Sequence, residues 1–94
     1  MRPGEVWRLE DGSLRLVLSP ATYNASALNR VITAVVGGPP VGFDPFAVTT
    51  TIGTIYADRL AMHPRHWLME VVGAIGDEPL ATARAHLRFL LVER

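Results

Sequence analysis

The chain of 94 residues contains no cysteine and no lysine, and its formal net charge at pH 7 is zero. Without cysteine it can form neither a disulfide framework nor a thiolate metal site, which fits a reducing compartment. Net neutrality removes the broad basic surface on which general affinity for nucleic acid depends. No apolar run reaches the roughly 18–20 residues of a membrane span, and no signal-peptide apolar core follows the N-terminal residues. We therefore expect a cytoplasmic protein that makes no membrane contact.

A hydrophobic content of 49% beside 19% charged residues is typical of a globular chain, and the length predicts one domain, 1–94. Alternating or β-branched apolar patterns predict strands at 5–9, 14–18, 30–36, 46–52, 54–57 and 69–74. Asp11-Gly12 predicts a tight hairpin turn, and 21–29 a loop with one helical turn. After the helix-start signal Gly76–Pro79, apolar residues recur at helical spacing. The pattern predicts a mainly β, α+β fold: a small SH3-like barrel or strongly bent antiparallel sheet with a C-terminal helix.

The segment Gly53–Met69 concentrates charged and aromatic side chains, so we expect it to supply part of any site. Asp58 and Arg59 are expected to follow directly after the strand 54–57. His63 and His66 flank a proline turn and are more simply surface polar groups than metal ligands, because no third ligand is evident. The sequence therefore predicts no metal and no cofactor.

Four motifs occur in an order that covers nearly the whole chain. The opening Met1–Trp7 resembles M-x-R-G-[DE]-[IV]-[WY], and Leu16–Asn24 resembles L-V-[IV]-S-P-x-x-[FY]-N. Further along, Ile55–Leu60 resembles V-x-x-D-Q-[IL], and Val72–Ile75 resembles I-G-x-[IL]. Together they resemble the MazF/PemK-type toxins. The resemblance implies a barrel-like sheet with a C-terminal helix, a homodimer and a cognate antitoxin of a type II toxin–antitoxin pair. It also implies metal-independent, sequence-selective cleavage of single-stranded RNA.

The resemblance also suggests where a site would lie. The family's catalytic arginine precedes the second strand; Ser13 stands at that position, and Arg15 follows on the same strand face. Arg15 is the expected cation for the phosphate, and Asp58 matches the family's acid. The candidate catalytic residues are thus Arg15 and Asp58, and the candidate RNA-binding residues are Ser13, Tyr56, Arg59 and Thr51. Apart from Ser13, each has a plainer alternative: a solvated arginine, a turn acid, a core tyrosine, or a strand threonine.

Two departures from the family weaken the case for catalysis. The loop between the first two strands is short, and Gly37 stands where the family has threonine or serine. One alternative is a CcdB-type gyrase poison, which shares the fold and acts through its C-terminal helix, although the terminal Trp-Gly pair of that family is missing here. A second alternative is a catalytically degenerate member that acts by partner binding.

Overall fold

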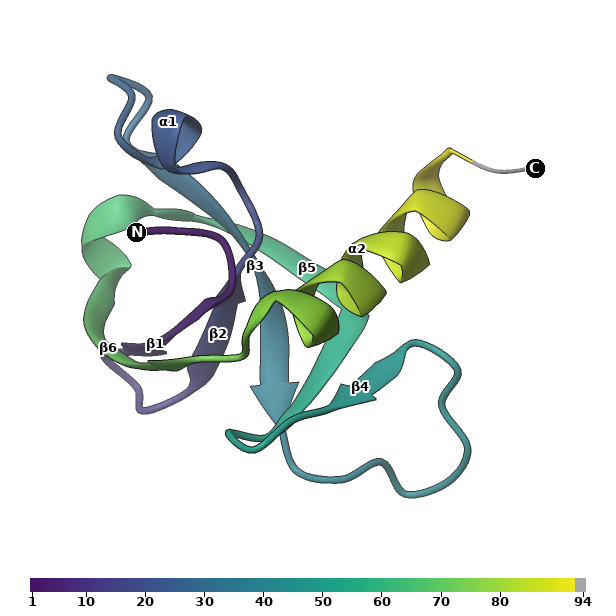
Figure 1. Cartoon of the computed structure of the whole chain (residues 1–94). Coiled ribbons are helices and arrows are strands. Elements are labelled where there is room, and N and C mark those ends of the chain that lie inside the picture. Colours follow the sequence, from purple (N-terminus) through teal and green to yellow (C-terminus); the bar gives the residue numbers. More distant parts are fainter. Residues whose placement is uncertain (93–94) are drawn as a thin grey trace.

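The structure is a computed structural model and describes residues 1–92. Six antiparallel strands form one bent sheet in the order β4-β5-β3-β2-β1-β6, and helix α2 lies against one face (Figure 1). The elements are β1 (Glu5–Leu9), β2 (Leu14–Val17), α1 (Ala21–Asn24), β3 (Arg30–Gly37), β4 (Ala47–Thr49), β5 (Thr54–Pro64), the 3₁₀ turn η1 (Arg65–Trp67), β6 (Leu68–Ala74) and α2 (Asp77–Leu91). The predicted bent antiparallel sheet with a C-terminal helix is confirmed. None of the described helices is long and apolar enough to cross a membrane.

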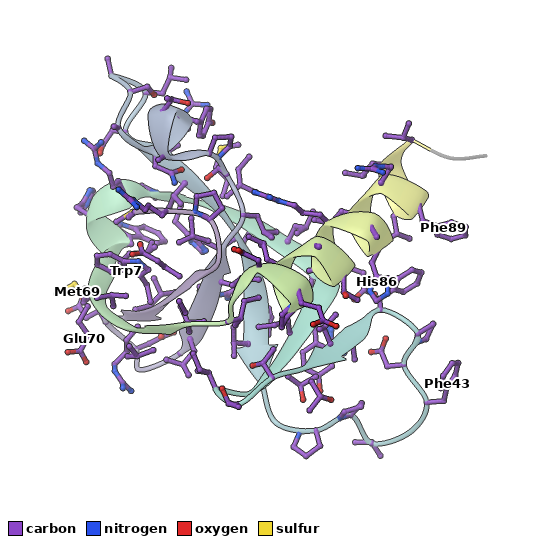
Figure 2. All side chains as sticks on the ribbon, viewed as in Figure 1. Trp7, Phe43, Met69, Glu70, His86 and Phe89 are labelled. Carbon is purple, nitrogen blue, oxygen red and sulfur yellow. The ribbon has the colours of Figure 1, made fainter. Side chains whose placement is uncertain are left out.

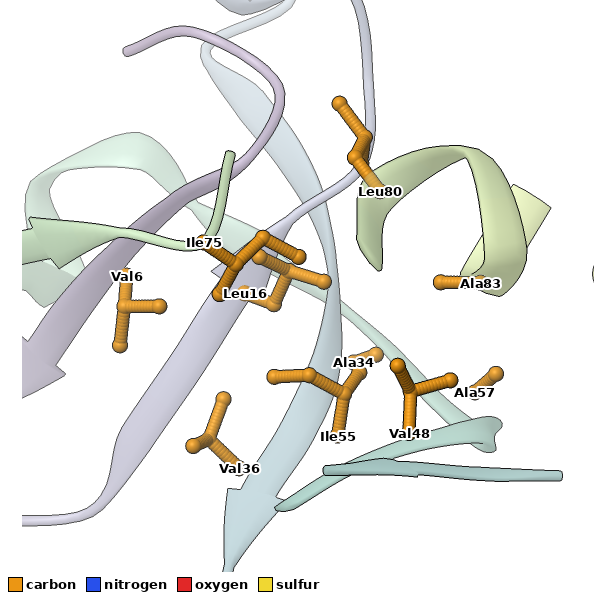
Figure 3. Close-up of a cluster of buried hydrophobic side chains, with 10 residues drawn as sticks. All are labelled: Val6, Leu16, Ala34, Val36, Val48, Ile55, Ala57, Ile75, Leu80 and Ala83. Atoms are coloured by element: carbon orange, nitrogen blue, oxygen red, sulfur yellow. The ribbon is translucent and has the colours of Figure 1, made fainter. Parts of the chain in front are cut away.

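Both faces of the sheet carry buried side chains, so apolar and polar residues do not alternate strictly along the strands. Leu16 and Val17 are neighbours in the chain, point to opposite faces and are both fully buried. The larger core lies between the sheet and α2 and contains Val6, Leu16, Ala34, Val36, Val48, Ile55, Ala57, Ile75, Leu80 and Ala83 (Figure 3). A smaller core of Leu9, Val17, Val31 and Leu68 lies on the other face, packed by Met1 and Trp7. Arg15 lies on the side of the smaller core.

Strand β5 is longer than predicted and contains a bulge. Ala34 of β3 pairs with Leu60, whereas the next residue, Val35, pairs with Tyr56. Three residues of β5, 57–59, therefore lie opposite a single step of β3. The sequence prediction that Asp58 and Arg59 follow the strand is wrong, because the bulge lets pairing resume and continue to Pro64.

The predicted strand 46–52 is also too long. Only Ala47–Thr49 pairs with β5, because the side chain of Thr50 organises a turn directly afterwards. Its hydroxyl donates to the carbonyl of Gly53 at 2.7 Å and accepts from the backbone amides of Ile52 and Gly53, each at 3.2 Å. Thr51 is consequently an exposed turn residue and not part of a strand.

Helix α2 begins where the sequence predicts and projects beyond the sheet at its far end. Gly76 precedes it with φ +86°, a conformation that favours glycine, and Leu80 and Ala83 are buried against the sheet. Leu90 and Leu91 continue the apolar pattern but are 41% and 72% exposed. Figure 1 shows the C-terminal half of the helix extending away from the strands.

Candidate functional site

A cavity of about 500 Å³ lies between the β1–β2 hairpin and the η1 turn. Its lining residues are Leu9, Glu10, Asp11, Arg15, His63, His66, Trp67 and Met69. They come from three separate parts of the chain, which antiparallel pairing of β1 with β2 and with β6 brings together. The volume is within the range of small-molecule sites in proteins. Figure 2 shows Met69 on this side of the molecule, near Trp7 of β1.

Arg15 is held in this cavity by the pairing of β2. It lies opposite Trp7 on one side and Val35 on the other, so its backbone is fixed within the sheet. Its Nε is buried and has no hydrogen-bond partner within residues 1–92. Because Nε is shielded from solvent, an acceptor that enters the cavity would meet the terminal guanidinium nitrogens, which are not among the buried unpaired atoms.

His63 is buried beside Arg15, contrary to the expectation of a surface residue. It is 8% exposed, its Nε2 lies 3.1 Å from the hydroxyl of Thr33, and its ring centroid is 6.0 Å from that of Trp67. Burial, and secondarily the positive charge of Arg15, lower the pKa of His63 below the usual 6.5. The imidazole is therefore neutral near pH 7. No alternation along β5 signals this burial, because residues 58–60 are all exposed; His63 is buried because the bulge and the pairing with Val31 turn it toward the smaller core.

The β1–β2 hairpin places two carboxylates at the mouth of the cavity. Asp11 accepts hydrogen bonds from the amide and hydroxyl of Ser13, at 2.9 and 2.6 Å. The pKa of Asp11 is lowered mainly by the hydrogen bond from the Ser13 hydroxyl, then by the bond from the Ser13 amide. The positive charge of Arg15 lowers it further. Ser13 therefore stabilises the turn, and its hydroxyl is already engaged. Glu10, the second acid, is exposed to solvent and lines the same cavity.

The other predicted site residues lie outside this cavity. Tyr56 is 6% exposed, donates its hydroxyl to the carbonyl of Gly38 at 2.5 Å, and has the guanidinium of Arg59 4.3 Å from its ring centroid. Tyr56 and Arg15 both pair with Val35, so their backbones are two strands, roughly 10 Å, apart. Asp58 is exposed in the bulge, and Thr51 lies at the β4–β5 turn. The structure therefore brings Arg15 together with His63 and not with Asp58.

The described residues contain no group of three histidine, aspartate or glutamate side chains arranged to hold a metal ion. A second hollow of about 510 Å³ adjoins the first, because His63 and His66 line both. Its other lining residues are Leu28, Asn29, Arg30, Met62 and Pro64. The two hollows are therefore neighbours beside η1 and the end of β5.

No protein-family model and no curated protein sequence matches the chain. Solved structures do match it over its full length. Two crystal structures of MazE-MazF from Deinococcus radiodurans superpose on it with TM-scores of 0.86 and 0.84, at 26% and 27% identity. Each match covers 100% of this chain and 98% or 97% of the other. The chain is MazF-like.

A mycobacterial endoribonuclease in complex with its cognate antitoxin also superposes on this MazF-like chain, with a TM-score of 0.84. The match covers 97% of this chain and 94% of the other at 17% identity, and at that identity it shows the fold alone. The resemblance carried by the four sequence motifs is thus confirmed by the whole arrangement of strands and helix. None of these matches assigns a role to an individual residue.

Proposed function

We propose that this MazF-like chain is the toxin of a type II toxin–antitoxin pair and a sequence-selective, metal-independent endoribonuclease acting on single-stranded RNA. The observation that carries the proposal is the full-length match to the two MazE-MazF structures, at 26% and 27% identity. The name of the mycobacterial neighbour, an endoribonuclease in complex with its antitoxin, supports the same activity and the same kind of partner. As a toxin acting on cellular RNA, the protein would work in the cytoplasm.

Cleavage of RNA without a metal needs a base for the 2′-hydroxyl proton, a cation for the charge that grows on the phosphate, and a proton for the leaving oxygen. Arg15 is proposed as that cation, because its side chain lines the cavity. Asp58 is proposed as the second catalytic group, exposed in the β5 bulge.

The RNA-binding roles of Ser13, Tyr56, Arg59 and Thr51 also remain predictions. Because Arg59 covers the ring of Tyr56, a base could stack on that ring only if Arg59 moved aside. An exposed Arg59 could instead contact a phosphate itself. Thr51 lies in an exposed turn, where its hydroxyl could contact the RNA.

Incubating the purified protein with RNA in EDTA tests the proposed activity. We expect cleavage by the wild type, and a loss of at least about 100-fold for Arg15→Gln, since removal of one charge-stabilising donor typically has this effect. Arg84→Gln, on the exposed face of α2, is the matched control and should cleave normally. Absence of cleavage by the wild type would favour the alternative of a catalytically degenerate protein, to which Gly37 and the short hairpin point.

A homodimer and an antitoxin complex are proposed as the states in which the toxin exists. The apolar side chains of Met62, Trp67 and Met69 are 53%, 52% and 60% exposed. Exposing apolar surface to water is unfavourable, and a protein interface would bury it. Sedimentation at micromolar concentration should give twice the chain mass, and Trp67→Ser should weaken the association. A wild-type monomer under these conditions would contradict the dimer.

The gyrase-poison alternative is less well supported, because the structural neighbours described above are MazF proteins and endoribonucleases. It predicts that toxicity depends on the exposed end of α2 and disappears in cells with resistant gyrase. Expression of a Phe89→Ser, Leu91→Ser double variant separates the two functions, since the nuclease proposal predicts that this variant stays toxic.

A further inference from the structure

The cavity between the hairpin and η1 contains two groups that the sequence resemblance does not connect, Arg15 and His63. We propose that this cavity binds one nucleotide of the RNA, with its phosphate at Arg15, and that His63 is the general base that takes the 2′-hydroxyl proton. The catalytic part of this inference rests on the proposed endoribonuclease function. It assigns the role of the base to a buried imidazole that lines the same cavity as the phosphate-binding cation.

The phosphate end of the pocket is defined by Arg15. Among the described residues, its Nε is one of two buried side-chain nitrogens that have no hydrogen-bond partner, the other being Nδ1 of His86. Arginine presents a planar fork of donors, so a phosphate in the cavity would bind the terminal guanidinium nitrogens, which unlike Nε are not among the buried unpaired atoms. Because Trp7 and Val35 flank its backbone within the sheet, Arg15 can meet the phosphate without backbone rearrangement.

The chemistry of a general base is assigned to His63. Its Nε2 is held by the hydroxyl of Thr33, and Thr33 is itself completely buried, so the ring orientation is fixed. Its Nδ1 makes no hydrogen bond within residues 1–92 and is not among their buried unpaired atoms, so this nitrogen keeps some exposure beside the two hollows that His63 lines. A neutral imidazole with one tethered and one accessible nitrogen can accept a proton near pH 7.

The reaction then proceeds with complete proton balance. The 2′-oxygen forms a bond to phosphorus as the bond from phosphorus to the 5′-oxygen breaks, and His63 takes the 2′-hydroxyl proton. A water molecule protonates the departing 5′-oxygen, and protonated His63 neutralises the resulting hydroxide. The products are a 2′,3′-cyclic phosphate and a 5′-hydroxyl, and Arg15 stabilises the charge on the phosphoryl oxygens throughout.

The other walls of the pocket suit a nucleobase. Glu10 and Asp11 at the mouth can accept hydrogen bonds from an exocyclic amino group such as that of cytosine. The adjoining hollow, with Arg30 on its wall, offers a path for the neighbouring nucleotide.

Binding can be tested without cleavage by recording the imidazole ¹⁵N signals of the protein while 3′-CMP is added. The chain has three histidines, and His86 packs edge-on against Phe46 of the loop before β4, outside the cavity, which makes it an internal control. We expect the signals of His63 and His66 to shift and that of His86 to stay constant. Cytidine, which lacks the phosphate, and the Arg15→Gln variant should each weaken binding by at least about tenfold. Equal shifts for all three histidines, or none, would overturn the pocket.

The catalytic role is tested by the pH dependence of kcat/KM. The charged and titratable groups around His63 are Arg15 from β2, Glu10 and Asp11 from the hairpin, His66 from η1 and Arg30 from β3. We expect wild-type kcat/KM to fall on the acid side of neutrality as His63 becomes protonated. His63→Gln should lose about 10²- to 10⁴-fold and lack this acid limb, whereas His86→Gln should retain both rate and profile.

These two experiments separate the failure of each proposal. If wild-type protein binds 3′-CMP at His63 but cleaves no RNA, the endoribonuclease function is wrong while the nucleotide pocket stands. If RNA is cleaved and His63→Gln keeps the wild-type rate and acid limb, the function stands and the assignment of His63 is wrong. His63→Asn provides a second variant that keeps a polar side chain at this position in case glutamine disturbs the fold.

Discussion

Replacing Asn24 by alanine should strongly destabilise the protein, because this side chain connects the N-terminus, the end of β2 and α1. Asn24 is 1% exposed and makes three hydrogen bonds. Its amide donates to the carbonyl of Met1 at 3.0 Å and to that of Ser19 at 2.9 Å, and its oxygen accepts from the Ser19 hydroxyl. The same hydroxyl accepts from the amide of Ile32 at 3.0 Å, which extends the network to β3.

The expected magnitude follows from these contacts. Each of the three hydrogen bonds contributes about 1 kcal/mol net, so the variant should lose about 3 kcal/mol. For a chain of this length each 1 kcal/mol lowers Tm by about 4–8 °C, which gives a decrease of about 12–24 °C. Urea denaturation followed by circular dichroism measures the loss directly, provided that the m-value stays constant.

A double-mutant cycle with Ser19→Ala tests whether the network acts as a unit. Because the two side chains bond each other, their effects should be non-additive by at least about 0.5 kcal/mol. Thr82→Ala is the control: it removes one exposed bond, from the Thr82 hydroxyl to the carbonyl of Glu78 at 3.2 Å, and should change stability by less than about 0.5 kcal/mol. A loss below about 1 kcal/mol for Asn24→Ala would refute the argument.

Three further predictions concern His63, the glycines and Tyr56. Because the pKa of His63 is lowered in the folded state, the unfolded chain binds more protons. The free energy of unfolding should therefore fall as the pH drops from about 6.5 toward the folded pKa. His63→Gln should flatten this pH dependence, and an unchanged pH dependence in the variant would contradict the prediction. Gly53→Ala should lower Tm more than Gly12→Ala. A Cβ at position 53 would lie 3.0 Å from the side chain of Val36 and 3.1 Å from the backbone oxygen of Gly37, whereas a Cβ at Gly12 would have nothing within 4 Å. Equal decreases in Tm would show that the positive φ alone sets the cost of the substitution. Tyr56→Phe should lose about 1 kcal/mol in urea denaturation through the bond to the carbonyl of Gly38, and a neutral effect would show that the Arg59 contact holds the ring by itself.

Local signals in the sequence determined most of the fold. Asp11-Gly12 specified the hairpin, and Gly76–Pro79 specified the helix start. Such features depend on backbone conformations and hydrogen bonds within a few residues, which residue type alone can specify. The order of the four motifs was enough to indicate the MazF-like arrangement.

Only the tertiary structure decided which polar side chains meet. The bulge at 57–59 arises from pairing with β3, which a single strand's sequence does not reveal, and it leaves Asp58 exposed while β5 continues to His63. The meeting of Arg15 with His63 depends on contacts between β2, β3 and β5, which are far apart in the chain. Residue types and turns are thus specified locally, whereas the composition of the cavity depends on strand register and sheet curvature, which the whole chain sets together.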